Sequence, residues 1–226
     1  MKSLVLFDLD GTLMDTPNAI VDTFTAVLAS LGVHDVAAEA IRATIGRPLG
    51  EAFAQLLGAE GGEAAAVDAG TVAAAVERYQ ALYRERIVPQ ARALLYPGVA
   101  EGLASLQAKG AILAVVTSKF TASAEVLLSA GGVREHFTMV VGADAVSQPK
   151  PHPEAGLLVA AKLGFEPGRT VMVGDTTHDI LMAHNAGMQS IAVTYGIHSE
   201  TVLSAAEPTW TAESFPRAVD HILDAA

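Results

Sequence analysis

Five short, mostly apolar runs are spaced along the chain, and each is too short to be a helix of ordinary length. Such a run, when it is bounded by glycine or polar residues, is typical of a strand that is buried on both faces of a sheet. The strands predicted in this way span residues 4–7, 111–116, 139–141, 170–173 and 190–193.

Stretches with helical periodicity separate these strands, at residues 99–109, 122–130, 154–163 and 180–186. Strands that alternate with helices of this length predict βαβ units and therefore a parallel sheet. We expect an α/β protein with a Rossmann-like parallel sheet and helices on both faces. Right-handed crossovers then place the carboxyl ends of all strands at one edge, where open α/β sheets bind ligands.

The segment between the first two predicted strands breaks the alternation. From residue 15 to residue 88 only helical patterns occur, and alanine-rich stretches such as 64–75 have a high helix propensity. We therefore expect a Rossmann-like catalytic core formed by residues 1–14 and 89–226. Residues 15–88 are expected to form an α-helical cap domain, inserted after the first strand, over the ligand-binding edge.

Composition removes several classes of protein. No apolar stretch approaches the roughly 18 residues of a membrane helix, and no cleavage signal follows Lys2, so a cytoplasmic protein without membrane contact is expected. The net charge is −11 and the basic residues are scattered, which argues against nucleic-acid binding. The chain has no cysteine, so disulfides and thiolate metal ligands are excluded.

The end of the first strand carries the most informative pair of side chains. Asp8 and Asp10 follow the apolar run 4–7, and in extended backbone residues two apart point the same way. Two carboxylates this close are unfavourable unless a cation or a shared proton offsets them. The pair predicts a metal site, a nucleophile, or both, although an Asp-x-Asp pair can also form a turn without chemistry.

Three further polar motifs lie at or near later strand ends. Thr117, Ser118 and Lys119 follow the second strand, Lys150 stands between two prolines, and Asp175 and Asp179 follow the fourth strand. Each alone has a structural explanation, such as a strand threonine, a surface lysine or a helix cap. Their order along the chain is what makes a functional site the better interpretation.

Together, the four motifs resemble the haloacid dehalogenase-like superfamily, in its phosphatase branch with an α-helical cap. The resemblance covers nearly the whole chain. Within the superfamily the chain is most similar to the phosphoglycolate phosphatase-like group, through the runs 7–12, 96–99 and 150–153.

The resemblance implies a role for each motif residue. Asp8 is expected to attack phosphorus and form an aspartyl-phosphate, while Asp10 protonates the leaving group and then activates water. Mg²⁺ would be held by Asp8, the backbone carbonyl of Asp10 and Asp175. Thr117, Ser118 and Lys150 are expected to bind the phosphoryl group. Asp179 would anchor Lys150 or a metal-bound water, and the Lys150–Pro151 peptide bond is expected to be cis.

The substrate expected from the resemblance is a small phosphorylated metabolite, such as phosphoglycolate, a sugar phosphate or a nucleotide. A cap loop at residues 45–49 resembles the segment that gives related enzymes their selectivity, which makes Arg47 a candidate specificity residue beside Lys119. The chain is expected to be a monomer or a homodimer.

Two alternatives stay open at this stage. One is a β-phosphoglucomutase-like phosphotransferase, although those enzymes carry a histidine where Ile20 stands. The other is a phosphate-binding regulatory module without turnover. The absence of lysine between Met14 and Val88 argues against a Schiff-base mechanism in the cap.

Overall fold

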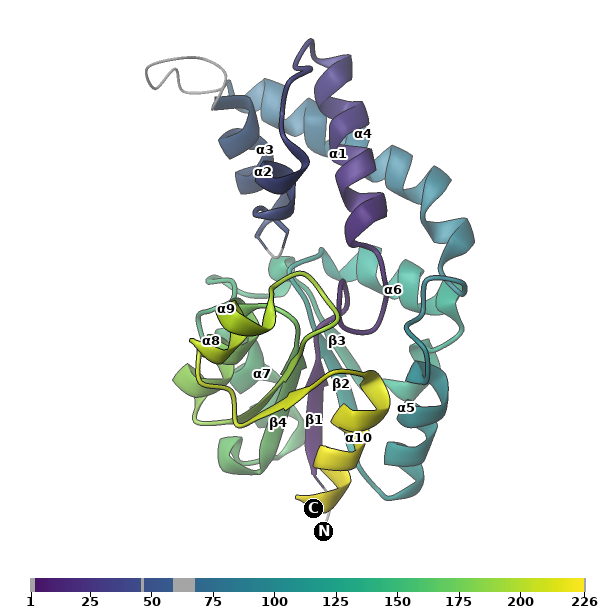
Figure 1. Ribbon diagram of the computed structural model, residues 1–226, viewed down its shortest axis with the longest axis vertical. Helices are drawn as coiled ribbons and strands as arrows, with labels where there is room; N and C mark the ends of the chain where they lie inside the picture. Colours follow the sequence, from purple (N-terminus) through teal and green to yellow (C-terminus); the bar gives the residue numbers. More distant parts are fainter. Residues whose placement is uncertain (1–2, 46, 59–67, 226) are drawn as a thin grey trace.

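A computed structural model describes residues 3–45, 47–58 and 68–225 of the chain. A six-stranded, wholly parallel sheet with strand order β3-β2-β1-β4-β5-β6 lies at its centre (Figure 1). The expected α/β fold is thereby confirmed. The strands are β1 Leu4–Phe7, β2 Ile112–Val116, β3 Met139–Val141, β4 Thr170–Gly174, β5 Gln189–Val193 and β6 Trp210–Ala212.

Helices cover both faces of this sheet. Alternate residues of β1 point to opposite faces, so Val5 and Phe7 join one apolar cluster while Leu4 and Leu6 join the other. The first cluster includes residues of α5, α6 and α10, and the second includes residues of α7 and α8. The bounds are α5 Val99–Ala108, α6 Thr121–Gly131, α7 Glu154–Leu163, α8 Thr177–Ala186, α9 Glu200–Ser204 and α10 Phe215–Asp224.

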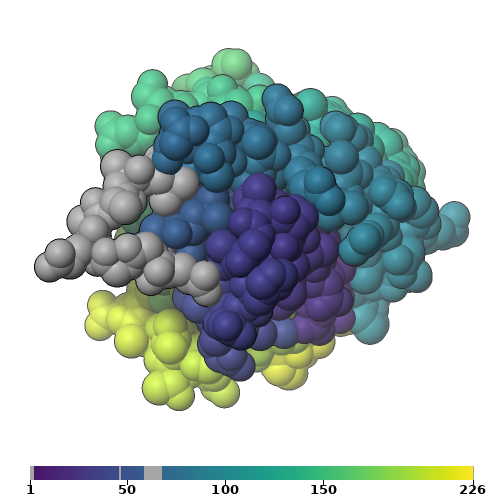
Figure 2. Space-filling model, turned by 90° about the horizontal axis from the view of Figure 1, so that it is seen from above, coloured from purple at the N-terminus to yellow at the C-terminus, as the bar shows by residue number. Residues whose placement is uncertain are grey.

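The inserted segment forms α1 Pro17–Ser30, α2 Ala38–Arg42, α3 Leu49–Gly58 and α4 Ala69–Arg86. These helices lie beyond the carboxyl ends of the strands (Figure 1), and a view onto this end shows their purple and blue atoms over the α/β part (Figure 2). Phe24 of α1 packs against Phe53 of α3 and Tyr79 of α4, with ring centroids 4.6 Å and 4.8 Å apart. These aromatic side chains hold the helices of the insert together and belong to the same apolar cluster as Val5 and Phe7. Residues 64–67 of the alanine-rich stretch lie outside the described residues.

The two connections between the insert and the α/β part run side by side. The amide of Asp15 donates to the Leu94 carbonyl at 2.7 Å, and the amide of Tyr96 donates to the Leu13 carbonyl at 3.1 Å. The chain therefore leaves the α/β part and returns to it at one place. Four short 3₁₀ turns complete the connections, at Val88–Gln90, Arg134–His136, Ala143–Ala145 and Pro167–Arg169.

The sequence patterns identified five of the six strands but no element beyond residue 193. β6 has only three residues, of which Thr211 is exposed and Ala212 is buried, so it lacks a continuous apolar run. Helix α8 also begins three residues earlier than predicted. Its first turn is polar and is stabilised by Thr176 and Asp179, which form a capping box.

Candidate active site

The strand register brings the polar ends of three central strands to one level. Phe7 of β1 pairs with Val115 of β2 and with Val173 of β4, so Asp8 follows at the level where those strands end. The amide of Asp8 donates to the Val173 carbonyl at 2.9 Å, which fixes its backbone against β4. The side chain of Asp8 is consequently buried at the centre of the sheet edge.

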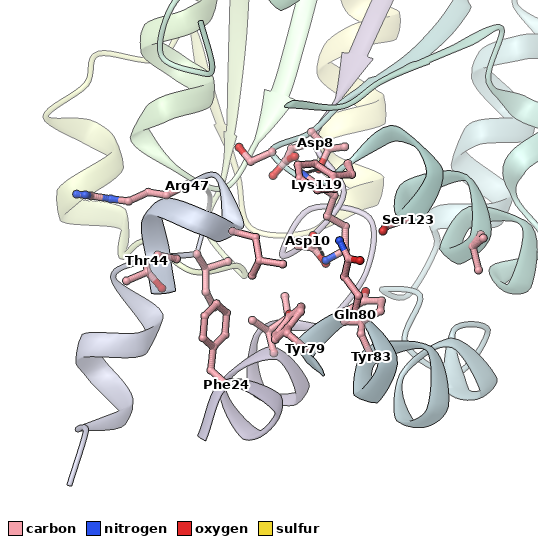
Figure 3. A pocket seen from close by; sticks show the side chains of 18 of the residues that line it. Asp8, Asp10, Phe24, Thr44, Arg47, Tyr79, Gln80, Tyr83, Lys119 and Ser123 are labelled. Carbon is pink, nitrogen blue, oxygen red and sulfur yellow. Dashed lines mark hydrogen bonds and ion pairs between the residues drawn. The ribbon is translucent and has the colours of Figure 1, made fainter. Parts of the chain in front are cut away.

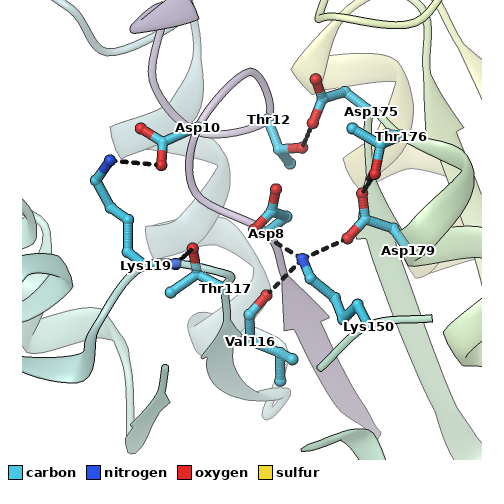
Figure 4. Close-up of polar contacts among 10 residues, drawn as sticks. All are labelled: Asp8, Asp10, Thr12, Val116, Thr117, Lys119, Lys150, Asp175, Thr176 and Asp179. Atoms are coloured by element: carbon cyan, nitrogen blue, oxygen red, sulfur yellow. Dashed lines mark hydrogen bonds and ion pairs between the residues drawn. The ribbon is translucent and has the colours of Figure 1, made fainter. Parts of the chain in front are cut away.

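Lys150 is the cation at the centre of the site (Figure 4). Its Nζ lies 3.0 Å from Asp8 Oδ1, and donates to Asp179 Oδ1 at 2.6 Å and to the Val116 carbonyl at 3.2 Å. The three ammonium hydrogens thus have three acceptors, on β1, β2 and α8. The side chain is 3 % exposed, so this lysine does not occupy the solvated position usual for its type. The Lys150–Pro151 peptide bond is cis.

Asp179 is held on both of its carboxylate oxygens. Oδ2 accepts hydrogen bonds from the amide of Thr176 at 3.1 Å and from its hydroxyl at 2.7 Å, while Oδ1 accepts from Lys150. The third residue of α8 therefore links the start of that helix to the Lys150 loop. The contact with Lys150 that the resemblance implied is present.

Asp175 follows β4 and is fully buried. Its Oδ1 accepts from the Thr12 hydroxyl at 2.8 Å, and its Oδ2 accepts from the amide of Ile197 at 2.8 Å. Glycines leave the space for it: a Cβ on Gly11 would lie 2.1 Å from Asp175 Oδ2, and a Cβ on Gly196 would lie 2.3 Å from the same atom. Gly11 also has a φ of +86°, a conformation that favours glycine.

The three buried carboxylates form a cluster suited to a cation. One oxygen from each of Asp8, Asp175 and Asp179 lies within 4.8 Å of the others, and Lys150 is the ammonium in contact with two of them. Burial raises the pKa of Asp8 to about 6, even though the charge of Lys150 acts to lower it. Burial and the charges of Asp8 and Asp179 raise the pKa of Asp175 well above its usual range.

A divalent metal ion fits this donor set. Ionised carboxylates are hard oxygen ligands. A divalent cation would offset the negative charge of the three carboxylates that Lys150 alone does not neutralise. Asp8 and Asp175 are better placed to hold it than Asp179. Asp179 already accepts three hydrogen bonds, one of them from the Lys150 ammonium, whereas Asp175 accepts two, both from neutral donors.

Asp10 lies apart from this cluster. Its Oδ2 is 2.9 Å from Lys119 Nζ, and its Oδ1 accepts from the Thr16 hydroxyl at 2.6 Å (Figure 4). Burial lowers the pKa of the Lys119 ammonium, but the charges of Asp10, Tyr79 and Asp8 and the hydrogen bond with Asp10 together raise it above its usual value. Thr16 directly precedes α1, so the orientation of Asp10 is tied to the start of the inserted helices.

Thr117 and Ser118 lie at the end of β2, next to Asp8. The amide of Thr117 donates to the Val141 carbonyl at 3.0 Å, and its hydroxyl accepts from the amide of Lys119 at 3.3 Å. Both residues line the same cavity as Asp8 and Asp10. Two hydroxyl side chains and the backbone of a strand end therefore face the space above the carboxylates.

A cavity of about 190 Å³ lies between the sheet edge and the inserted helices (Figure 3). Its floor is polar and its opposite wall is mostly apolar and aromatic. The floor includes Asp8, Asp10, Thr117, Ser118 and Lys119, and the wall includes Ile20, Phe24, Ile45, Leu49, Tyr79 and Tyr83.

Arg47 lines this cavity, but its side chain is turned away from the carboxylates. It is exposed, its Nη1 donates to Gln55 Oε1 at 3.1 Å, and in Figure 3 the guanidinium points away from Asp8 and Asp10. Gly46 of the same loop lies outside the described residues. Lys119, the other candidate specificity residue, lies directly over the Tyr83 ring, 4.3 Å from its centroid.

Several residues of the site were not singled out from the sequence. The hydroxyl of Thr12 donates to Asp175, and the hydroxyl of Thr16 donates to Asp10. Both threonines lie within eight residues of Asp8, so their closeness to the Asp-x-Asp motif could have indicated them from the sequence. Tyr83 and the amide of Ile197 come from helical or loop segments far away in the sequence, where no pattern distinguishes them.

A parallel sheet with buried aspartates, one central lysine and strand-end hydroxyls at its carboxyl edge has its polar groups where open α/β proteins bind their ligands, and the cation and donors suit an anionic ligand. The sequence model of haloacid dehalogenase-like hydrolases matches residues 5–193, and the chain belongs to this family.

Curated relatives agree with this assignment. A protein of Dickeya dadantii (strain 3937) named "Probable phosphatase IndB" is 52 % identical over 219 residues, covering 97 % of this chain and 93 % of the relative. A phosphoglycolate phosphatase of Haemophilus influenzae (strain 86-028NP) is 32 % identical over 213 residues, covering 94 % of each chain. The chain is a phosphatase, and it is similar to phosphoglycolate phosphatases.

Solved structures share the complete fold. The crystal structure of a "predicted phosphoglycolate phosphatase" from Haemophilus somnus 129PT superposes with a TM-score of 0.85 at 26 % identity, over 100 % of this chain and 98 % of that one. CbbY from Rhodobacter sphaeroides, solved in complex with phosphate, gives 0.75 at 28 % identity over 95 % of each chain. None of the helices in the described part of this chain combines the length and apolar character that a bilayer span requires.

Proposed function

We propose that the chain is a Mg²⁺-dependent phosphatase that hydrolyses a small phosphomonoester through an aspartyl-phosphate on Asp8. The observation that carries this proposal is the position of Asp8. It is buried at the end of the central strand, 3.0 Å from the Lys150 ammonium and within 4.8 Å of Asp175, beneath a cavity lined by hydroxyls.

In the first half-reaction, a carboxylate oxygen of Asp8 attacks phosphorus and the ester P–O bond breaks. The phosphoryl oxygens lie against Thr117, Ser118 and Lys150, whose donors offset the charge on the equatorial oxygens. Asp10, two residues further along the chain, transfers a proton to the departing alkoxide. Asp8, the backbone carbonyl of Asp10 and Asp175 would hold a Mg²⁺ ion, which would supply further charge neutralisation at the phosphoryl group.

In the second half-reaction, Asp10 is the base. It takes a proton from a water molecule, whose oxygen attacks phosphorus as the bond to Asp8 breaks. Phosphate leaves and Asp8 is a carboxylate again. The hydrogen bond from Thr16 orients Asp10 in both steps, and the ion pair with Lys119 orients it in the second, which Asp10 enters as a carboxylate. Asp10 ends that step protonated and can act again as the acid.

Residues 15–88 are proposed to act as the cap domain over this site. Their helices supply the apolar wall of the cavity, which keeps bulk water away from the phosphoenzyme. A cavity of about 190 Å³ is smaller than the roughly 300 Å³ at which pockets for drug-sized ligands begin. The size favours a small ester, such as phosphoglycolate or a sugar phosphate, over a nucleotide.

The mutase alternative receives less support. Ile20 is buried and lines the cavity, so an aliphatic side chain stands where mutases carry a histidine. The proteins of Dickeya dadantii and Haemophilus influenzae described above are also named as phosphatases.

The test is hydrolysis of p-nitrophenyl phosphate with and without Mg²⁺, by wild type, Asp8→Asn and Asp220→Asn. Asp220 is an exposed residue of α10 that pairs with Arg217, so it controls for loss of a carboxylate. We expect Mg²⁺-dependent turnover in wild type and in Asp220→Asn, and essentially none in Asp8→Asn. Near-normal turnover by Asp8→Asn, or no release by wild type with Mg²⁺, would refute the proposal.

A further inference from the structure

The hydroxyl of Tyr83 is a buried polar group without a hydrogen-bond partner among the residues that the structure describes. Tyr83 lies on α4, near its carboxyl end, and the residue is only 4 % exposed. A buried donor left unpaired is unfavourable, so such a group in a folded protein calls for a ligand or a functional reason.

The ring of Tyr83 is fixed in the wall of the catalytic cavity (Figure 3). Its neighbour on α4, Tyr79, has its ring centroid 5.9 Å away, and the Lys119 ammonium lies 4.3 Å from the Tyr83 centroid. Lys119 in turn contacts Asp10 at 2.9 Å. Tyr83 is therefore one residue removed from the group proposed to protonate the leaving alkoxide.

Apolar residues such as Ile20 and Phe24 line much of the cavity, and Gln80, Arg84 and Ser123 line it as well. Among the described residues that line the cavity, the Tyr83 hydroxyl is the buried side-chain group that lacks a hydrogen-bond partner. Burial also raises the pKa of the Tyr83 phenol well above its usual value, so the hydroxyl keeps its proton and can donate. A neutral donor in an apolar wall discriminates strongly, because a ligand without an acceptor leaves it unpaired.

We propose that the Tyr83 hydroxyl donates a hydrogen bond to an oxygen acceptor on the alcohol portion of the substrate and selects phosphomonoesters that carry one. This inference rests on the proposed function and adds to it a residue and a chemical requirement. The phosphoryl group is bound by the floor of the cavity, and Tyr83 recognises the remainder of the molecule.

Two matched pairs of esters test the assignment. 2-Phosphoglycolate is compared with ethyl phosphate, which lacks the carboxylate oxygens. Ribose 5-phosphate is compared with cyclopentylmethyl phosphate, which lacks the ring and hydroxyl oxygens. The proteins are wild type, Tyr83→Phe, and Tyr96→Phe as a control. The hydroxyl of Tyr96 donates to Asp15 outside the cavity, so its loss removes a phenol without altering the proposed contact.

We expect wild type to prefer the oxygen-bearing member of at least one pair by about tenfold or more in kcat/KM. In Tyr83→Phe that preference should fall by about tenfold. The fall should come from a lower kcat/KM for the oxygen-bearing ester, while kcat/KM for the ester that lacks the oxygen changes by less than about twofold. Tyr96→Phe should keep the wild-type ratio. The melting temperature of Tyr83→Phe should not fall, because the hydroxyl removed has no partner in the free protein.

The inference fails if wild type prefers neither oxygen-bearing ester, or if Tyr83→Phe keeps the wild-type ratio in both pairs. These outcomes are distinct from failure of the proposed function, in which wild type with Mg²⁺ would also leave p-nitrophenyl phosphate intact.

Discussion

Lys150 and Asp179 are joined by a buried hydrogen bond of 2.6 Å, from Nζ to Oδ1, and neither side chain is more than 3 % exposed. Because the other oxygen of Asp179 caps α8, this one carboxylate sets the position of both the helix and the lysine. The first prediction concerns what happens when its charge is removed.

Asp179→Asn should lower both stability and turnover. The side-chain amide of the variant has one acceptor oxygen in place of two. It can therefore accept from Thr176 or from Lys150, but it must turn its NH₂ group, which is a donor, toward the donor of the other residue. We expect the free energy of unfolding to fall by about 3 kcal/mol, as when a buried charge loses its partner. Turnover should fall about 10- to 100-fold, as when a group that positions active-site residues is lost. Chemical denaturation and p-nitrophenyl phosphate kinetics measure the two effects.

Asp220→Asn is the control, since Asp220 pairs with Arg217 on the exposed face of α10 and its loss should change stability by less than about 0.5 kcal/mol. Equal effects of the two substitutions would contradict the role assigned to Asp179.

Lys119→Met should lower kcat by about tenfold or more, the scale on which acid–base groups contribute. The substitution keeps most of the length of the side chain but removes the ammonium that holds Asp10 Oδ2. Steady-state kinetics on p-nitrophenyl phosphate measures the effect, with Lys162→Met, at an exposed position of α7, as control. If Lys119→Met changes KM alone, Lys119 binds substrate without orienting Asp10.

Gly196→Ala should weaken the metal site without removing any ligand. Its new Cβ would stand 2.3 Å from both Cβ and Oδ2 of Asp175, so that the carboxylate must move. We expect the Mg²⁺ concentration for half-maximal activity to rise by about tenfold or more, as when a group supporting a metal ligand is lost. Gly168→Ala is the matched control, because a Cβ there meets nothing within 4 Å. An unchanged Mg²⁺ requirement in Gly196→Ala would show that Asp175 is not a ligand.

Mg²⁺ should stabilise the wild-type protein against heat. A ligand that binds the folded state at about 100 times its Kd contributes about 2.7 kcal/mol. The increase in melting temperature on adding Mg²⁺ should be lost in Asp175→Asn and kept in Asp220→Asn. Differential scanning fluorimetry against EDTA-treated protein measures it. An equal increase in all three proteins would place the stabilising ion outside the aspartate cluster.

The acidic residues at the strand ends could be predicted because they follow local sequence patterns. Asp8 and Asp175 each follow a run of apolar residues, and parallel strands place such ends together whatever the helices between them do. The contact between Lys150 and Asp179 was implied by the family resemblance, but the pairing of Lys119 with Asp10 could not be predicted. Lys119 was a candidate specificity residue, and only the packed side chains show that it lies beside Asp10.

The residues that the inserted helices and loops contribute to the site were harder to predict from the sequence. Arg47 was expected from its loop to face the substrate, yet it bonds to Gln55. Tyr83 had no distinguishing pattern, because a tyrosine on an amphipathic helix is ordinarily a core residue. Its significance depends on Lys119 and on the unpaired state of its hydroxyl, and both are features of tertiary packing.

The contacts of Asp175 also bear on how the protein is completed during synthesis. The carboxylate depends on Thr12, near the start of the chain, and on the amide of Ile197, beyond the last long strand. A nascent chain that has not yet emerged past residue 197 lacks half of these restraints. Tight metal binding should therefore arise only after residue 197 has emerged, so that a chain that stops short of it is inactive and not an unregulated phosphatase.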